Sequence, residues 1–265
     1  MPSLLRPPAV AGLFYPGSPD ALAQEVQRLL AAARPAEYSP KALIAPHAGY
    51  VYSGAIAASA YAVLRQAAPY IRRVVLLGPT HRVAVRGLSL PAAEAFATPL
   101  GNVALDRAAA QAIADLPQVS VSPEAHAQEH ALEVQLPFLQ TVLPDFKLLP
   151  LAVGMATPEE VAEVLERLWG GAETLIVISS DLSHYLPYAQ AQAMDRATVQ
   201  DILQLHGPLS HEQACGGTPI NGLLLAARKH HLTAHLLDLR NSGDTAGPRD
   251  GVVGYAALAF TEEDR

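Results

Sequence analysis

Short apolar runs alternate along the chain with longer segments in which apolar residues recur at helical spacing. The apolar runs predict strands at Ala42–Ala45, Val74–Leu77, Leu148–Val153, Thr174–Ile178, Ala234–Leu239 and Gly254–Phe260. Several runs are apolar at consecutive positions, which is typical of strands covered on both faces. The longer segments predict helices at Pro19–Ala33, Gly54–Gln66, Asp106–Leu116, His130–Val142, Pro158–Trp169, Tyr188–Leu205 and Pro219–His230.

Two of the predicted helices begin with residues that favour helix initiation. Thr157 is followed by Pro158, Glu159 and Glu160, which supplies an N-cap, a proline at the first helical position and early acids. Ser18-Pro19-Asp20 likewise supplies an N-cap, a proline and an early acid. The alternation of strands and helices predicts an α/β fold with a central, mostly parallel sheet flanked by helices. No repeat or linker divides the chain, so we expect a single domain over residues 1–265.

Composition and charge restrict the classes of function. Half of the 265 residues are hydrophobic and 16% are charged, which argues against disorder. The net charge of −7 removes the main electrostatic attraction to nucleic acid or anionic lipid, so neither is an expected partner. Cys215 is the one cysteine, which excludes an internal disulfide. Because Arg6 and two prolines interrupt the N-terminal apolar stretch and no run reaches about 18 residues, we expect a cytoplasmic protein.

Histidines follow three of the predicted strands. His47 comes after Ala42–Ala45, His81 after Val74–Leu77, and His184 after Thr174–Ile178, at the end of Ser179-Ser-Asp-Leu-Ser-His184. Parallel strands bring their carboxyl ends to one edge of a sheet, where ligands of α/β proteins bind. A single histidine after a strand is usually structural, but three equivalent ones favour a site. Converging neutral imidazoles are suited to a transition metal.

The third ligand of such a metal could be either Cys215 or a carboxylate, and the pattern does not decide between them. Cys215 precedes a predicted helix, and a thiol near a helix N-terminus has a lowered pKa. A lone cysteine is as readily explained as a small buried hydrophobe.

A second motif suggests a different enzyme. His126-Ala-Gln-Glu129-His130 matches the H-x-x-E-H signature of inverted zinc peptidases, which places two zinc ligands and a glutamate base on one helix. Pro123 lies only three residues upstream, so His126 falls at or before the first helical turn. His130 and Glu133 would share one helix face, and the simpler explanation of both is an exposed polar surface.

Taken together, the motifs resemble those of the Memo family, relatives of the class III extradiol dioxygenases. The resemblance runs nearly end to end. It is carried by Arg6-Pro-Pro-Ala-Val-Ala-Gly-Leu-Phe-Tyr15-Pro, Ala45-Pro-His47-Ala-Gly-Tyr-Val-Tyr-Ser-Gly54, Leu77-Gly-Pro-Thr-His81, Glu129-His-Ala-Leu-Glu-Val-Gln-Leu-Pro-Phe138, Ser179-Ser-Asp-Leu-Ser-His184, Cys215-Gly-Gly-Thr-Pro-Ile220 and Asn241-Ser-Gly-Asp244. His126 falls outside these motifs, which weakens the zinc-peptidase interpretation.

The resemblance implies a single α/β domain with one cleft and a mononuclear metal site. It implies His47, His81 and Cys215 as metal ligands, with His184 at the acid/base position. Asp181 would line the same cleft and is the second catalytic candidate, and Glu129, His130 and Asp244 are further candidates for the wall of the cleft. The dioxygenase relatives hold Fe(II) with two histidines and a glutamate, so Fe(II) is the expected metal. Cysteine in place of glutamate is a softer ligand, which also admits copper or zinc.

Two classes of function follow. The first is a metal-dependent oxidoreductase of extradiol dioxygenase type, with a small-molecule or peptide ligand in the cleft. The alternative is a metal-binding or partner-binding protein without turnover. The resemblance suggests a radical-SAM protein and an AMMECR-type protein as its partners in a modification pathway.

Overall fold

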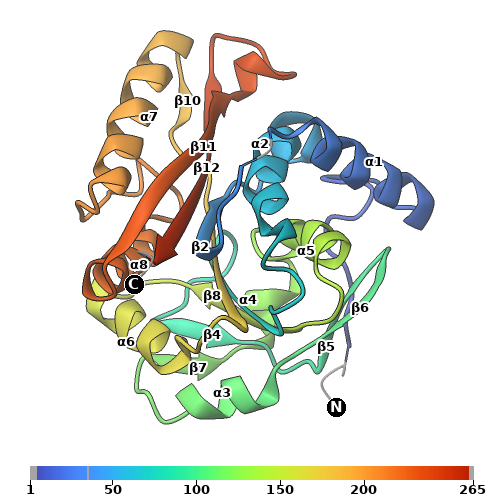
Figure 1. The fold of residues 1–265 in the computed structure, drawn as a ribbon, viewed down its shortest axis with the longest axis vertical. Coiled ribbons are helices and arrows are strands. Elements are labelled where there is room, and N and C mark those ends of the chain that lie inside the picture. Colours follow the sequence, from blue (N-terminus) through green and yellow to red (C-terminus); the bar gives the residue numbers. More distant parts are fainter. Residues whose placement is uncertain (1–4, 35, 263–265) are drawn as a thin grey trace.

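The computed structural model describes residues 5–34 and 36–262, and its centre is a mixed β-sheet (Figure 1). Four neighbouring strands of this sheet are parallel, in the order β2 (Pro40–Ala45), β9 (Thr174–Ser179), β3 (Arg73–Pro79) and β8 (Lys147–Val153). Further strands extend it on both sides: β12 (Val252–Glu262), β11 (Leu232–Asn241), β10 (His184–Leu186), β4 (Leu88–Leu90) and β7 (Val119–Val121). A separate small sheet contains β1 (Leu5–Arg6), β5 (Ala95–Thr98) and β6 (Gly101–Ala104).

Helices cover both faces of the sheet, because its parallel strands are apolar on both sides. In β3, Val74 and Leu76 belong to one hydrophobic core, while Val75 and Leu77 belong to the other. On the first face lie α1 (Pro19–Ala32), α2 (Tyr50–Ala62) and α5 (Leu136–Val142). On the second face lie α3 (Arg107–Ile113), α6 (Pro158–Leu168), α7 (Tyr188–Leu203) and α8 (Gly217–Lys229). Figure 1 shows the two helical layers on opposite sides of the sheet.

The α/β class and the six predicted strands are confirmed, but the sheet is mixed: besides the four central strands, the edge strands β4 and β7 are parallel to each other, while other neighbours are antiparallel. β12 pairs antiparallel with both β2 and β11. β11 and β12 are joined by the 3-10 helix Ser242–Asp244 and one loop, and so short a connection permits only antiparallel pairing.

The predicted helix over residues 130–142 is wrong in its first half. A 3-10 turn at Glu133–Gln135 precedes α5, which begins at Leu136 with Pro137 in its first turn. Proline is favoured at that place in a helix, so it marks the true start. The short helix α4 (Pro123–Ala127) ends before Glu129.

The predicted start of α6 is confirmed as a complete capping box. The Thr157 hydroxyl accepts a hydrogen bond from the Glu160 amide, and the Glu160 carboxylate accepts one from the Thr157 amide at 2.8 Å. We expect Thr157→Ala to lower the free energy of unfolding by about 1 kcal/mol, because an orphan amide of the first turn loses its acceptor. Urea denaturation would measure this change. Thr157→Ser, which keeps the hydroxyl, should stay close to the wild type, and equal losses in both variants would contradict the capping argument.

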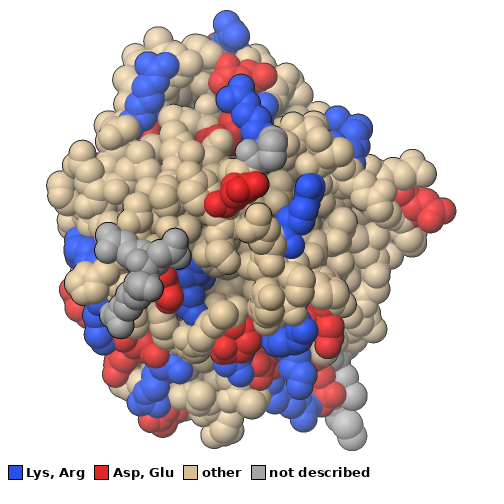
Figure 2. Space-filling view, in the orientation of Figure 1, with Lys and Arg blue, Asp and Glu red and all other residues tan. Residues whose placement is uncertain are grey.

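Charged side chains of both signs are interspersed on the surface. On the face in Figure 2, Lys and Arg alternate with Asp and Glu around largely uncharged areas. Within the described residues, no helix combines the length and apolar character needed to cross a membrane. Residues 1–4 of the N-terminal segment that bears on targeting lie outside the described range.

Candidate metal centre

Two of the strand-end histidines meet at the carboxyl edge of the parallel strands. β2 and β3 lie on either side of β9, and the ring centroids of His47 and His81 are 5.2 Å apart. His130, which follows α4, joins them. One ring nitrogen from each of the three lies within 4.8 Å of the others. Because imidazole nitrogen is a strong donor to transition metals, this group could hold a metal ion.

The hydrogen bonds behind His47 fix which of its ring nitrogens carries the proton. Ser179 Oγ lies 2.6 Å from the Ala131 carbonyl, to which it donates its single hydrogen, and it accepts from Gln135 Nε2 at 2.8 Å. His47 Nδ1 lies 2.8 Å from the same oxygen, so Nδ1 must be the donor. The Nε2 atom of His47 therefore presents a lone pair to the site.

The carboxylate of Glu129 orients the ring of His81 in a similar way. This carboxylate accepts from the His81 amide at 2.6 Å and lies 2.9 Å from His81 Nδ1. Burial raises the pKa of Glu129, but hydrogen bonds from His81 and from the Ala131 amide outweigh it and lower the pKa to about 2. An ionised carboxylate only accepts, so His81 Nδ1 donates to it, which leaves Nε2 as the nitrogen that a metal would take. The same carboxylate lies 3.4 Å from His130 Nδ1.

Two of the imidazoles, those of His47 and His130, have lowered pKa values, which keep them in the neutral form that binds metal. Burial lowers the pKa of His47 to about 3, and the neighbouring His81 adds to the effect. Burial and the nearby His47 lower the pKa of His130 to about 4. Neither ring therefore has to release a proton at neutral pH before it can bind a cation.

Cys215 lies against the histidine cluster. Its Sγ is 3.3 Å from His47 Nε2 and accepts a hydrogen bond from the Asp181 amide at 3.3 Å. The expectation of an acidic thiol is wrong, because burial and the negative charge of Asp181 raise the pKa of Cys215 to about 12. Gly216 permits this approach, since a Cβ there would lie 2.7 Å from the Ser180 Cβ.

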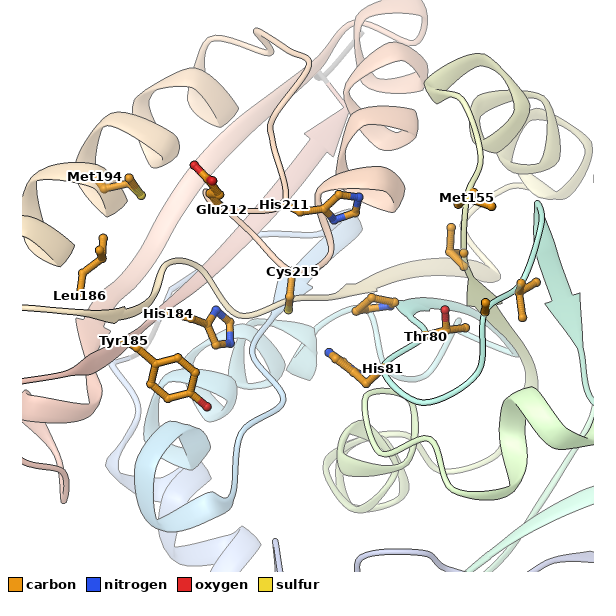
Figure 3. A pocket seen from close by; sticks show the side chains of 15 residues that line it. Thr80, His81, Met155, His184, Tyr185, Leu186, Met194, His211, Glu212 and Cys215 are labelled. Atoms are coloured by element: carbon orange, nitrogen blue, oxygen red, sulfur yellow. The ribbon is translucent and has the colours of Figure 1, made fainter.

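A cleft of about 830 Å³ opens in front of these groups (Figure 3). His81, His184 and Cys215 line it together. His184 Nδ1 lies 2.8 Å from the Leu182 carbonyl, which can only accept, so Nδ1 is protonated and Nε2 is free. Asp181 is buried behind them, where it accepts from the His47 amide at 2.7 Å; burial raises its pKa.

Two other candidate residues of the site, His126 and Asp244, lie away from the cleft. The zinc-peptidase interpretation is wrong, because α4 ends before Glu129 and does not carry both histidines of the motif. His126 is buried, with Nε2 2.8 Å from the Ser89 carbonyl. Asp244 does not line the cleft, since its carboxylate accepts from the Asn241 amide and the Tyr188 hydroxyl.

The expected exposed polar surface is also wrong, because Glu129 and Glu133 are buried. Glu133 pairs with Arg6 at 2.5 Å. Arg6 also donates to the carbonyls of His126 and Glu129, at 2.8 and 2.6 Å. The N-terminal segment thereby holds the stretch that carries Glu129 and His130 against the sheet.

Ser179 and Gln135, which orient His47, had no role in the sequence-based prediction. Both lie inside the motifs that carry the family resemblance, and that position was the available signal. Their action depends on the meeting of segments more than 40 residues apart, as the 44-residue separation of their hydrogen bond shows.

Comparisons with known proteins agree along nearly the whole chain. The profile of the Memo-like protein family matches residues 6–259. A MEMO1 family protein of Methanosarcina barkeri is 38% identical over 268 residues, which cover 96% of this chain and 99% of the relative. A MEMO1 family protein of Aquifex aeolicus is 37% identical over 270 residues, with 97% and 99% covered.

A solved structure has the same fold at low sequence identity. The crystal structure of an uncharacterized protein from Escherichia coli K12 superposes with a TM-score of 0.54 at 16% identity, covering 83% of this chain and 98% of that one. With the family profile and the relatives over nearly full length, these findings show that the chain belongs to the Memo-like protein family.

Proposed function

We propose that the protein binds one Fe(II) ion at His47, His81 and Cys215 and carries out oxidoreductase chemistry on a ligand in the cleft. The observation that carries the proposal is the meeting of three imidazoles and a thiol at one strand edge. The donor set fits a transition metal, because the hydrogen bonds of His47 and His81 are made by Nδ1, which leaves Nε2 of each as the nitrogen for a metal. A bound iron would supply Lewis acidity and one-electron redox chemistry. Copper and zinc suit the same donors.

The remaining groups have separate roles in the proposal. His130 supplies a further imidazole within reach of the two histidine ligands. His184 lines the cleft with Nε2 free, which suits it to accept and return a proton of the bound ligand. Asp181 orients His47 through its backbone amide.

Metal content tests the proposal. Protein purified without oxygen should contain close to one iron per chain by elemental analysis, and Cys215→Ser and His81→Gln should lose most of it because a ligand is removed. His206→Gln, an exposed imidazole away from the cluster, is the matched control and should keep its metal. Equal metal in all four proteins would contradict the site. Oxygen uptake with a panel of catechols, compared with His184→Ala, then tests the reaction.

The thiol favours a second candidate function, that of a copper- or zinc-binding protein without turnover. Sulfur beside imidazole is a soft donor set, and a thiolate ligand is itself open to oxidation. Such a protein would act through partners, of which radical-SAM and AMMECR-type proteins are the proposed ones. Pull-down with and without metal separates the two functions, because partner capture that needs metal, without oxygen uptake, supports the second.

A further inference from the structure

Tyr185 has a backbone conformation that is unusual for a bulky aromatic residue. Its φ is +59°, in the left-handed region that favours glycine. Leu205 and His231 also have positive φ, but each lies directly beyond a helix cap, after α7 and α8, where this conformation is common. Tyr185 instead lies within β10, where the register with β12 shifts between His184 and Leu186.

The strained backbone brings the Tyr185 ring to the cleft. The residue is 78% exposed, and its ring centroid is 5.8 Å from that of His184. In Figure 3 the two side chains lie next to each other, with Cys215 and His81 beyond them. Strain kept at such a place indicates a functional requirement, since asparagine or glycine would adopt this backbone more easily.

A second exposed apolar side chain also lines the cleft. Met155 follows β8 and is 76% exposed. Met155 and Tyr185 are among the most exposed large apolar side chains of the described residues, and both line the cavity that contains His81. Exposed apolar groups at a concave site indicate a ligand that covers them. Thioether and phenol side chains both pack well against a flat π-system.

We propose that Tyr185 is the specificity-determining residue of the cleft, where its ring stacks on a planar apolar group of the ligand. The chelating end of that ligand reaches the histidine cluster. The proposal rests on the metal site proposed above, and it adds that flat, unsaturated groups bind in preference to saturated ones of similar size.

Three hydroxamates that share one chelating head test this preference. Benzohydroxamate, cyclohexanecarbohydroxamate and acetohydroxamate would be titrated into Co(II)-loaded protein, with binding followed by the visible absorption of cobalt. In the wild type, the phenyl compound should bind about three- to tenfold more tightly than the cyclohexyl compound, as expected for one aromatic pair. Tyr185→Phe should keep this ratio, because it keeps the ring.

Tyr185→Asn should bind the phenyl and cyclohexyl compounds with equal affinity, while its cobalt content should stay that of the wild type. Asparagine tolerates the left-handed conformation, so the thermal midpoint should not fall below that of the wild type. This combination of unchanged stability and lost preference separates ligand recognition from a merely structural role. Tyr70→Asn is the matched control, because Tyr70 is 68% exposed and does not line the cleft, and it should keep the ratio.

The outcomes distinguish the two proposals. Cobalt binding with equal affinity for the phenyl and cyclohexyl compounds, or a phenyl preference that survives in Tyr185→Asn, overturns the role of Tyr185 and leaves the metal site standing. A wild type that binds no cobalt overturns the metal site, and the role of Tyr185 with it. Loss of the preference in Tyr185→Phe overturns stacking and assigns the effect to the hydroxyl.

Discussion

Replacing Glu133 with alanine is expected to lower the free energy of unfolding by about 3 to 5 kcal/mol, because it leaves a buried arginine without its partner. Arg6 and Glu133 are 5% and 0% exposed, and their atoms approach to 2.5 Å. The carboxylate also accepts from the Ala9 and Val10 amides, at 2.7 and 3.0 Å, and from the Tyr15 hydroxyl at 2.6 Å. Each of these donors loses its acceptor in the variant.

Glu25→Ala is the matched control, since Glu25 also pairs with an arginine, Arg28, at 2.8 Å. That pair is exposed and three residues apart on α1, so its loss should change stability by less than about 1 kcal/mol. Urea denaturation at one pH compares the two variants. Similar losses in both would show that the Arg6–Glu133 pair is not an essential part of the fold.

Glu133→Ala should also weaken metal binding. Arg6 holds the carbonyls of His126 and Glu129, and Glu129 in turn orients His81. The N-terminal segment thus contacts the stretch beside the candidate metal centre through one buried charge, although none of its residues belongs to the histidine cluster.

The central strands could be predicted well because the pattern that indicates them lies within the sequence of each strand. Leu43 and Val75 lie in runs that are apolar at every position, which is typical of a strand covered on both faces. Strands of two to four residues, such as Leu88–Leu90 and His184–Leu186, are too short to show a period, and they were missed. The turn before α5 was also missed, because Glu133 finds its partner 127 positions away along the chain.

The site was predictable to the extent that topology decides it. His47 and His81 follow strands that flank β9, so their meeting follows from parallel order. The protonation of Cys215 did not follow from its place before a helix. The helix N-terminus favours the thiolate, but burial and Asp181 oppose it more strongly, and both effects arise only when distant segments pack together.

Metal binding should release one more proton from the wild type than from Cys215→Ser, if Cys215 is a ligand. A metal takes the thiolate, and a thiol whose pKa is raised to about 12 is protonated at neutral pH. His47 and His130, with pKa values lowered to about 3 and 4, are already neutral and release nothing. Relative to the variant, affinity should therefore rise about tenfold per pH unit between about pH 6 and pH 8.

Calorimetric titration with Zn(II) in two buffers of different ionisation enthalpy counts the released protons, and comparison with Cys215→Ser cancels the contribution of every other group. A difference of one proton supports Cys215 as a ligand. No difference, together with a large loss of affinity in His130→Gln, would make His130 the third ligand in place of the thiol. The thiolate would then be absent from the metal, and with it the soft donor that favours copper, so this one proton decides whether the site holds a metal through sulfur or through imidazole alone.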